Sequence, residues 1–503
     1  MNYIQNISLH SWKTTNPQLM QNLFYWGVSG CLKNNSHDLR YGKLSKLRVW
    51  QKECVEKALT LYQQGQRDFF CLACPGAGKT RMAAELAAIL LEQGKIDIVL
   101  CISPSVAVSQ GIQQTFESRI AKPLNGSLGA IGASLTYQAM TSKDESFWTL
   151  LKKMRALVIF DEVHHCAGLA PEHANTWGET ILLNIQSQAK YTLALSGTPW
   201  RSDKLPVTLA RYSDESNQVA YDYSYNLAQA VDDKVCRSPS MVLIDNKAIT
   251  FEQDGEKSLH NSLEDLFKER HVRYDTVLTH PTFLRHVLGL ANTKLLELRK
   301  TDLKAAGLVV ASSINHAYAI ARLLEDKFGQ PVTVVHHGAF EAQQIISRFK
   351  NGTAPWIVSV GMISEGTDIP RLQVCCHLSR VKTELYFRQV LGRVLRRTQS
   401  KNQQAWLYAA ATPSIKSFCL GLLEDIPYAL LIEKHGDERL KLTGTNDTSS
   451  TGTLGFIEPD SFELRESKEL DEQVSPNQIP WKMRLSDVFS RRLITLRDSA
   501  LYS

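Results

Sequence analysis

The chain has 503 residues, of which 43% are hydrophobic and 21% are charged, and its formal net charge at pH 7 is +6. This composition is ordinary for a globular protein, and the length exceeds what one hydrophobic core supports, so we expect two large domains with smaller pieces. No apolar run approaches the length that spans a bilayer, and the first residues do not resemble a secretion signal, so we expect a cytoplasmic protein that does not bind membranes. The mild positive charge permits a nucleic-acid groove without requiring one.

Residues 1–45 show no strong periodicity and are expected to form a small accessory segment. An amphipathic helix is then predicted to begin at Leu47 and to run past Leu61. It carries Gln51, whose side-chain amide can pair a donor and an acceptor with the edge of an adenine base. Because this helix lies just upstream of the loop described next, Gln51 favours ATP over other nucleotides.

The most informative stretch is Ala73–Thr80 (Ala-Cys-Pro-Gly-Ala-Gly-Lys-Thr), which we call the phosphate loop. It follows an apolar run and precedes an Ala- and Leu-rich run, so it reads as a turn between a strand and a helix. Backbone N–H groups in such a turn converge on an anion, and the helix dipole favours negative charge there. Lys79 would reach the outer phosphates, and the Thr80 hydroxyl would ligate Mg²⁺. The other residues expected at the phosphates are Gly76, Ala77 and Gly78.

Three further apolar runs, at residues 96–102, 156–160 and 191–195, each end in a polar cluster. Continuous apolar strands separated by helical stretches indicate a parallel sheet that binds its ligands at the carboxyl ends of the strands. Asp161 at such an end can hold Mg²⁺, and Glu162 can accept a proton from the water that attacks the γ-phosphorus. We interpret His164 as a polar link from this site to the second domain.

A second α/β pattern fills residues 301–440 and has no phosphate loop of its own. Before it, residues 221–300 show a polar helical pattern that predicts a helical connector or insertion. Within the second α/β pattern, Gln389 and Arg393, with Arg396 or Arg397, share one face of a predicted helix, because three- and four-residue spacings align. Guanidinium groups on one domain that face a nucleotide on the other act as arginine fingers.

Residues 441–503 are expected to form a linker and an accessory tail. The stretch 443–452 is rich in Thr, Ser and Gly, which is typical of a flexible linker. Beyond it, residues 481–496 suggest a basic amphipathic element. This element either docks a partner or nucleic acid, or packs back on the second domain.

The region from about Leu47 to Thr412 resembles the DExH-box motor ATPases of helicase superfamily 2. The stretches that carry this resemblance are Arg48 with Gln51, Ala73–Thr80, Asp161–His164, Ser196–Thr198, Gly366–Asp368 and Gln389–Arg396. Leu195–Arg201 is similar to the branch that contains XPB-type, UvsW-type and restriction-enzyme motor subunits, which acts mostly on DNA. The resemblance implies an α/β fold of two tandem RecA-like domains, with parallel sheets flanked by helices and small accessory elements at both ends. The expected ranges are 1–45, 46–220, 221–300, 301–440 and 441–503.

In such motors, the resemblance implies, ATP and Mg²⁺ bind between the two domains, and hydrolysis drives movement along a nucleic acid. Arg48, Gln51 and Gln389 would bind the nucleotide, Lys79, Glu162, Arg393 and Arg396 would serve catalysis, and Gly366 and Asp368 would couple the two sites. The residues expected to contact the strand are Ser103, Gln110, Thr136, Ser312 and Thr367.

The leading hypothesis is a DNA helicase or duplex-DNA translocase acting in repair, restriction or phage defence. An RNA helicase is the second hypothesis, because nothing in the motifs excludes RNA. The third is an ATP-gated motor subunit of a defence complex, in which a protein partner such as a nuclease subunit carries the chemistry.

Overall fold

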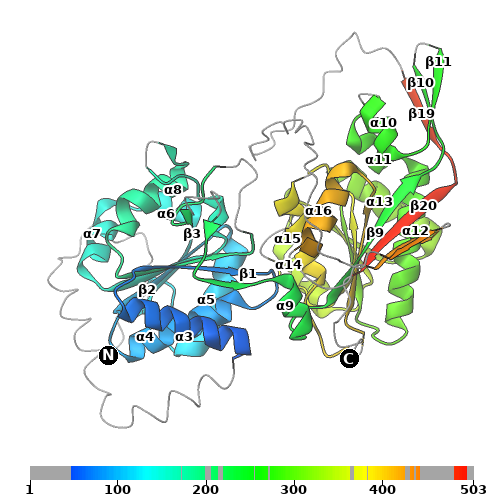
Figure 1. Ribbon diagram of the computed structural model, residues 1–503. Coiled ribbons are helices and arrows are strands. Elements are labelled where there is room, and N and C mark those ends of the chain that lie inside the picture. The colour runs from blue at the N-terminus through cyan, green and yellow to red at the C-terminus, as the bar shows by residue number, and fades with distance from the viewer. Residues whose placement is uncertain are drawn as a thin grey trace. The chain divides into compact units, whose positions relative to one another are not determined.

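The structure, a computed structural model, describes residues 47–170, 173–198, 205–212, 219–253, 255–269, 272–362, 367–381, 383–400, 402–424, 431–435, 438–441 and 481–495. The chain divides into two compact units. The first consists mainly of residues up to Ser224, and the second of residues from Tyr225 onward together with Cys74–Ala77. Each unit contains its own sheet with helices on both faces (Figure 1). The predicted accessory segment 1–45 and the predicted linker 443–452 lie outside the described residues.

The first unit is built on a six-stranded sheet with the order β3-β2-β4-β5-β1-β8. From β3 to β1 all neighbouring strands pair in parallel, so their carboxyl ends lie at one edge. Every residue of β4 and β5 is buried, as expected for apolar strands covered on both faces. The strands are β1 (Asp68–Ala73), β2 (Ile98–Ser103), β3 (Gly132–Thr136), β4 (Ala156–Phe160), β5 (Tyr191–Ser196) and β8 (Tyr223–Tyr225), and the short pair β6 (Arg211–Tyr212) and β7 (Val219–Ala220) lies apart from them.

Two groups of helices cover this sheet, one on each face (Figure 1). On one face lie α3 (Val49–Gln63), α4 (Lys79–Glu92) and α5 (Val106–Ile120), and on the other lie α6 (Tyr137–Thr141), α7 (Glu145–Lys153) and α8 (Thr176–Ile181). On the second face Tyr137, Trp148 and Ile181 pack with Phe70, Val158 and other strand residues in one buried cluster. The sheet therefore holds its strand ends rigidly between two helical layers.

The second unit is built on a nine-stranded sheet with the order β13-β14-β12-β15-β16-β9-β20-β17-β18. Neighbouring strands pair in parallel from β13 to β9, and the last three strands pair antiparallel. The strands are β9 (Ser238–Asn246), β12 (Ala306–Val310), β13 (Val332–His336), β14 (Trp356–Val360), β15 (Leu372–His377), β16 (Gln404–Ala410), β17 (Leu431–His435), β18 (Glu438–Lys441) and β20 (Phe489–Thr495). The helices are α9 (Leu227–Asp232), α10 (Leu263–Glu269), α11 (Tyr274–Thr279), α12 (Pro281–Arg299), α13 (Ile314–Phe328), α14 (Ala342–Asn351), α15 (Glu384–Val394) and α16 (Pro413–Glu424).

The range 221–300 differs from the predicted helical connector. It contains α9 to α12, but β9 pairs with β16 inside the second sheet, and β10 (Ile249–Gln253) and β11 (Glu256–His260) form a hairpin. The prediction was wrong because the run from Met241 to Ile244 is short and apolar, and its four residues are all buried between strands that follow much later in the chain. Such a run cannot be assigned from its neighbours alone.

The basic element near residues 481–496 packs back on the second unit. It forms β19 (Trp481–Leu485), which pairs with β10, and β20, which lies between β9 and β17. Phe489 of β20 stacks on His286 of α12 with a centroid distance of 4.1 Å. Of the two alternatives that the sequence leaves open, the structure therefore supports packing on the preceding domain.

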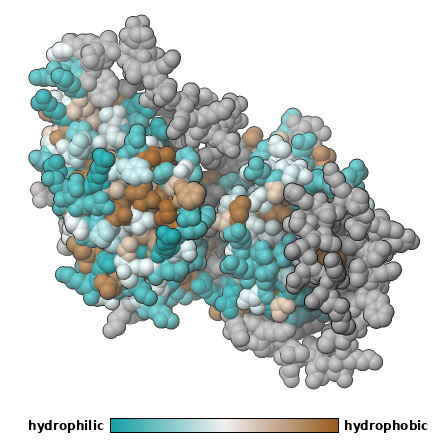
Figure 2. All heavy atoms as spheres, turned by 180° about the vertical axis from the view of Figure 1, so that it is seen from behind, coloured by the Kyte–Doolittle hydropathy of each residue, from teal (hydrophilic) through white to brown (hydrophobic). Residues whose placement is uncertain are grey.

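The outer surface of both units mixes residue types. Figure 2 shows hydrophobic residues gathered in the middle of the face that the second unit presents in that view, with hydrophilic residues around them. Apolar groups make up a large share of any folded surface, so these residues alone indicate no partner. In the described part of the chain, no helix combines the length and the apolar character needed to cross a membrane.

Candidate nucleotide and nucleic-acid site

Two glycines shape the phosphate loop. Gly76 has a φ of +84° and Gly78 has a φ of +97°, a region that side chains rarely adopt. A Cβ atom at Gly78 would also lie 2.8 Å from Gln51 Nε2, which is too close. The last two residues of the loop, Lys79 and Thr80, are the first two of α4, so the amino terminus of this 14-residue helix lies at the loop. This is the geometry in which backbone N–H groups and a helix dipole attract an anion.

Lys79 brings a buried cation to the carboxyl ends of the strands. Its side chain is nearly covered, and Nζ donates a hydrogen bond to Ala73 O at 3.0 Å. The same atom lies 3.5 Å from Glu162 Oε1, although the two residues follow different strands. The structure therefore brings together two residues that the sequence assigns to phosphate binding and to water activation.

Glu162 adopts a left-handed backbone conformation with a φ of +52°. Left-handed conformations are strained for residues other than glycine, asparagine and aspartate, and such strain often marks a functional site. Its Oε2 accepts a hydrogen bond from Gly197 N at 3.3 Å and lies 3.4 Å from His164 Nδ1. Burial alone would raise the pKa of Glu162, but the charges of Lys79 and His164 and the hydrogen bond from Gly197 outweigh it and lower the pKa well below its ordinary value. Glu162 is therefore ionised at neutral pH.

His164 connects the end of β4 to the end of β5. Its side chain is 2% exposed, and Nδ1 shares a hydrogen bond of 2.9 Å with Ser196 Oγ. Ser196 in turn accepts from Thr198 N at 3.1 Å. The sequence predicts a link from His164 to the second domain, whereas the partners found here lie in the first unit, because β4 and β5 are adjacent in its sheet. The contacts described here therefore join neighbouring strands of the first sheet, and the link from His164 to the second domain stays a prediction.

Gln51 joins the first turn of α3 to the phosphate loop. Its Nε2 donates to Gly78 O at 2.9 Å, and its Oε1 accepts from Arg48 N at 3.0 Å. The Arg48 guanidinium also approaches the loop, with Nη1 3.4 Å from the position that a Gly78 Cβ would take. The amide that was predicted to read adenine thus holds the loop from a side chain that is 2% exposed, and its contact with a base stays a prediction.

Asp161 and Thr80 are the residues expected to hold Mg²⁺. Asp161 is 9% exposed at the end of β4, and Thr80 lies in the first turn of α4 beside Lys79. The donor set fits the group: one carboxylate and one hydroxyl suit Mg²⁺, which takes oxygen ligands and keeps several waters. The buried ammonium of Lys79 and the positive-φ glycines fit the phosphates that accompany the metal.

Sequence reasoning missed the role of Tyr137. This residue is fully buried, its hydroxyl donates to Asp161 O at 3.0 Å, and its ring stacks on Trp177 with a centroid distance of 5.3 Å. It follows Thr136 directly, so it ties the end of β3 to the end of β4. The available signal was its position directly after Thr136, which the sequence predicts as a nucleic-acid contact.

In the second unit, the two predicted arginine fingers contact one short segment. Arg393 Nη1 donates to Thr367 O at 2.7 Å, and Arg396 forms an ion pair with Asp368. Gln389 and Arg393 lie on α15, but this helix ends at Val394, so Arg396 lies beyond it rather than on its face. The helix prediction extended too far. Gly366 lies outside the described residues.

The predicted strand contacts of the first unit differ in exposure. The side chain of Ser103 is completely buried, and its hydroxyl donates weakly to Leu135 O at 3.4 Å. It therefore faces the protein interior and not the surface on which a nucleic-acid strand would lie. Thr136 caps α6 by accepting from Ala139 N at 3.0 Å, and Gln110 is exposed on α5. Ser103 and Thr136 are paired at the ends of β2 and β3, so both belong to the carboxyl edge of the sheet.

The predicted strand contacts of the second unit lie at the corresponding edge of its sheet. Ser312 follows β12, and its hydroxyl shares a 2.7 Å hydrogen bond with His316 Nδ1. Thr367 is 7% exposed, and within the described ranges its Oγ1 has no hydrogen-bond partner. A buried hydroxyl in this state calls for an acceptor or donor from outside, such as a ligand or water.

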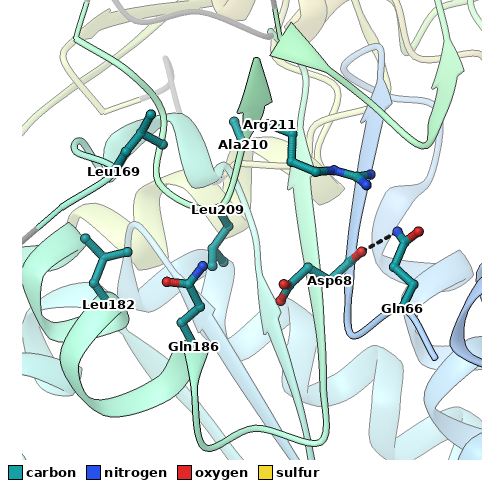
Figure 3. Close-up of a pocket in the computed structure, with 8 residues that line it drawn as sticks. All are labelled: Gln66, Asp68, Leu169, Leu182, Gln186, Leu209, Ala210 and Arg211. Atoms are coloured by element: carbon teal, nitrogen blue, oxygen red, sulfur yellow. Dashed lines mark hydrogen bonds between the residues drawn. The ribbon is translucent and has the colours of Figure 1, made fainter. Parts of the chain in front are cut away.

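A small cavity of about 140 Å³ lies elsewhere in the first unit. Figure 3 shows Asp68 and Gln66 on one side of it and Leu169 and Leu182 on the other. The remaining lining residues are Gln186, Leu209, Ala210 and Arg211. Asp68 begins β1, whereas the phosphate loop follows the end of that strand, so the cavity belongs to the opposite edge of the sheet. None of its lining residues was predicted to be functional.

Comparisons with known proteins give two family matches along the chain. Residues 44–201 match the family model of the res subunit of type III restriction enzymes, and residues 291–398 match that of the helicase conserved C-terminal domain. An uncharacterised protein of Mycobacterium tuberculosis is 30% identical over 384 residues, which cover 73% of this chain and 62% of that protein. The chain therefore spans less than two thirds of the length of that relative.

Two more distant relatives extend the comparison. A DNA 3'-5' translocase of Sulfurisphaera tokodaii is 23% identical over 404 residues, or 75% of this chain and 83% of that protein. A solved fragment described as an HsdR subunit of a type I restriction enzyme from Vibrio vulnificus shares the fold with a TM-score of 0.51 and 16% identity, covering 76% of this chain and 68% of the fragment. With both family matches in sequence order and the phosphate loop in place, the chain carries the two tandem RecA-like domains of helicase superfamily 2 and belongs to that family.

Proposed function

We propose that the protein is an ATP-driven DNA helicase or duplex-DNA translocase. The observation that carries the proposal is the group formed by Lys79, Glu162 and His164 beside a loop with two positive-φ glycines. A buried cation and an ionised carboxylate next to an anion-binding loop are the parts that phosphoryl transfer to water requires. Magnesium ATP supplies the phosphoryl group and the metal charge.

In this proposal the loop amides and Lys79 hold the phosphates, and Thr80 and Asp161 hold the metal. Lys79 now contacts Glu162, and a bound phosphate competes with that contact. If Lys79 turned to a bound phosphate, Glu162 would lose the charge that lowers its pKa most, and its pKa would move toward the range in which a carboxylate accepts a proton effectively. Water activation would then depend on phosphate binding.

The contacts between the carboxyl ends of neighbouring β-strands support coupling of the ATPase site to a bound nucleic acid. Tyr137 connects Thr136 to Asp161, and His164 connects Glu162 to Ser196. If a bound nucleic acid moved Thr136, the neighbouring Tyr137 would therefore pass the movement to Asp161, the proposed metal ligand, through one hydrogen bond. In the second unit, we propose that Arg393 and Arg396 leave the Thr367–Asp368 segment to stabilise the charge of the transferred phosphoryl group.

DNA is favoured over RNA by the relatives rather than by a contact in the structure. The matched res-subunit family belongs to restriction enzymes, and the archaeal relative is named a DNA translocase. The backbone contacts proposed for Thr136 and Thr367 carry no sequence information, as a motor on any sequence requires.

The test measures the ATPase rate of the full chain with Mg²⁺ in the presence of duplex DNA, single-stranded DNA or RNA. The rate of the Lys79→Ala variant is subtracted as the hydrolysis that does not come from this site. We expect DNA to stimulate the rate more than RNA of equal length. Stimulation by RNA alone would favour an RNA helicase. No stimulation by any nucleic acid, in the presence of normal nucleotide binding, would favour a motor subunit that acts only with its protein partner.

A further inference from the structure

Aromatic side chains gather at the carboxyl edge of the second sheet, outside the residues assigned so far. Phe340 is 89% exposed, and Tyr318 is 48% exposed. Tyr318 comes from α13, whereas Phe340 follows β13. His336, the last residue of β13, contacts the first of the two rings, because its Nε2 lies 3.4 Å from Tyr318 Oη, and Phe340 follows His336 four residues later in the chain. We call Tyr318, His336 and Phe340 the aromatic cluster.

Local contacts orient two rings of this cluster, those of His336 and Tyr318. After β13, Ala339 N donates to His336 O at 2.9 Å, which closes a tight turn through Gly338. His336 Nδ1 lies 3.5 Å from the position of a Gly338 Cβ, so the imidazole is packed over the turn. The ring of Tyr318 meets that of His336 edge to face, with centroids 6.0 Å apart and an interplanar angle of 70°. Tyr318 is therefore oriented by a neighbour, and the turn presents Phe340 to solvent.

The cluster shares its edge with the predicted strand contacts. β13 and β12 both pair in parallel with β14, so their carboxyl ends lie on the same side of the sheet. Ser312 follows β12, and Thr367 follows β14 in the chain, which places both residues at this edge. One helical turn after Tyr318, Arg322 is also exposed on α13 and adds a cation suited to a phosphate.

We propose that Tyr318 and Phe340 form a stacking platform for unpaired bases of the strand that the second unit holds, with His336 positioning Tyr318. The inference rests on the proposed function, because it adds base contacts to a site that otherwise grips the backbone. Aromatic faces bind every base, so stacking holds a single strand without reading its sequence. The carboxylate of Glu341, which follows Phe340 directly, disfavours a phosphate at that ring and favours a neutral base.

The experiment compares two single-stranded DNA oligonucleotides of equal length, one normal and one with abasic sites, by fluorescence anisotropy with the full chain. The wild-type protein is expected to bind the normal strand more tightly. The Phe340→Ala variant is expected to lose about five- to hundredfold in affinity for the normal strand, and little for the abasic strand. Tyr318→Ala should behave in the same way, and Phe340→Tyr, which keeps a ring, should restore the preference.

Two controls separate stacking from general damage. Leu303→Ala removes an exposed apolar residue of the same unit, 68% exposed, before β12 and thus at its amino end. This variant should bind both strands as the wild type does. The slope of affinity against salt concentration should be unchanged in Phe340→Ala, because no phosphate contact is removed.

The outcomes distinguish this inference from the proposed function. If the wild-type chain binds the normal and the abasic strands equally, or if Phe340→Ala loses the same factor on both, the stacking platform is wrong while nucleic-acid binding stands. If the wild-type chain binds neither strand nor duplex DNA, the proposed function fails, and the inference fails with it.

Discussion

The two units hold their buried charges in different ways. In the first, the Lys79 ammonium and the Glu162 carboxylate face each other across 3.5 Å from the ends of different strands. In the second, the Arg237 guanidinium is 0% exposed and donates to Leu372 O at 2.6 Å and to Val394 O at 3.2 Å. The first arrangement is a pair of side chains that an anion can separate, whereas the second is a cation fixed by backbone carbonyl groups.

The difference distinguishes charged side chains that are proposed to take part in the reaction from charged side chains that hold backbone segments in position. Burial lowers the pKa of Arg237 to about 10, so the guanidinium remains charged at neutral pH and needs its carbonyl partners. Arg371 is held in the same manner, by Phe349 O, Lys304 O and Ala354 O. Because Val394 is the last residue of α15, Arg237 also fixes the end of the helix that carries Arg393. The comparison predicts that substitutions in the first unit change turnover, and that substitutions of buried arginines change stability.

The largest effect is expected from Lys79→Ala. This change removes the cation of the phosphate loop and leaves the Glu162 carboxylate without its nearest counter-charge, so ATP binding and turnover should both disappear. Nucleotide binding measured by a fluorescent ATP analogue and the steady-state ATPase rate check this result. Lys57→Ala, on the exposed side of α3, is the matched control and should behave like the wild type. Normal ATP affinity in Lys79→Ala would refute the assignment of the loop.

Arg393→Ala is expected to reduce the nucleic-acid-stimulated ATPase rate by roughly a thousandfold or more, the usual contribution of a charge-stabilising arginine. Arg388→Ala is the control, since this arginine lies on the same helix but binds Glu384 at 2.8 Å. An unchanged rate in Arg393→Ala would contradict the finger role and leave Arg393 as a support for Thr367.

Glu162→Gln should retain ATP binding and reduce turnover by on the order of a hundred- to ten-thousandfold, because an amide cannot accept the proton of the attacking water. Single-turnover kinetics with radiolabelled ATP measure the chemical step directly. A variant that hydrolyses ATP at the wild-type rate would exclude Glu162 as the base.

The same variant reports on the lowered pKa of Glu162. A carboxylate whose folded pKa lies below its unfolded value of 4.5 stabilises the protein above that value, and this contribution is lost as the pH falls toward the folded pKa. The melting temperature of the wild type should therefore fall relative to that of Glu162→Gln as the pH is lowered below 4.5. A constant difference across this range would mean that the lowered pKa is not realised.

Arg237→Met tests the positioning charges of the second unit. Removal of the guanidinium leaves the carbonyl groups of Leu372 and Val394 without this donor in a buried place, which costs about 1–3 kcal/mol of unfolding free energy. Chemical denaturation measures the loss. ATP binding at the phosphate loop should be retained, and its loss at full stability would break the proposed division between reacting and positioning charges.

The smallest effect is expected from Tyr137→Phe. The ring and its stacking on Trp177 remain, but the hydrogen bond to Asp161 O is removed, which is worth about 1 kcal/mol or roughly a fivefold change in an equilibrium. We expect the stimulation by DNA to fall by about this factor while the basal ATPase rate stays within twofold. An equal fall in both rates would mean that Tyr137 supports the ATPase site itself rather than its coupling to DNA.

The sequence predicted local structure correctly where a chemical motif also marks a turn or a strand end. Gly76, Gly78 and Lys79 are identifiable because a strand, a glycine turn and a helix follow one another in the chain. Asp161 and Glu162 are identifiable because they end a run of five apolar residues that is buried throughout. Each of these features is local, so pattern and spacing suffice.

The parts that sequence missed depend on contacts between distant segments. β9 is recognisable only beside β16 and β20, which come from residues beyond 400. The Ser103 hydroxyl contacts Leu135 O of a strand, 32 residues later in the chain, and the hydrogen bond from Tyr137 follows from the order of strands in the sheet. The predicted helix extended past Val394 to Arg396, because the end of a helix is set by what it packs against.

The insertion of β20 between β9 and β17 has a consequence for biosynthesis. The strands of the first sheet are complete once Tyr225 has been made, so that unit can fold while translation continues. The second sheet has to wait for Thr495, and until then β9 has no neighbour on one side. During this interval an apolar strand edge is open to wrong partners, which makes the second unit the part of the nascent chain most in need of chaperone protection.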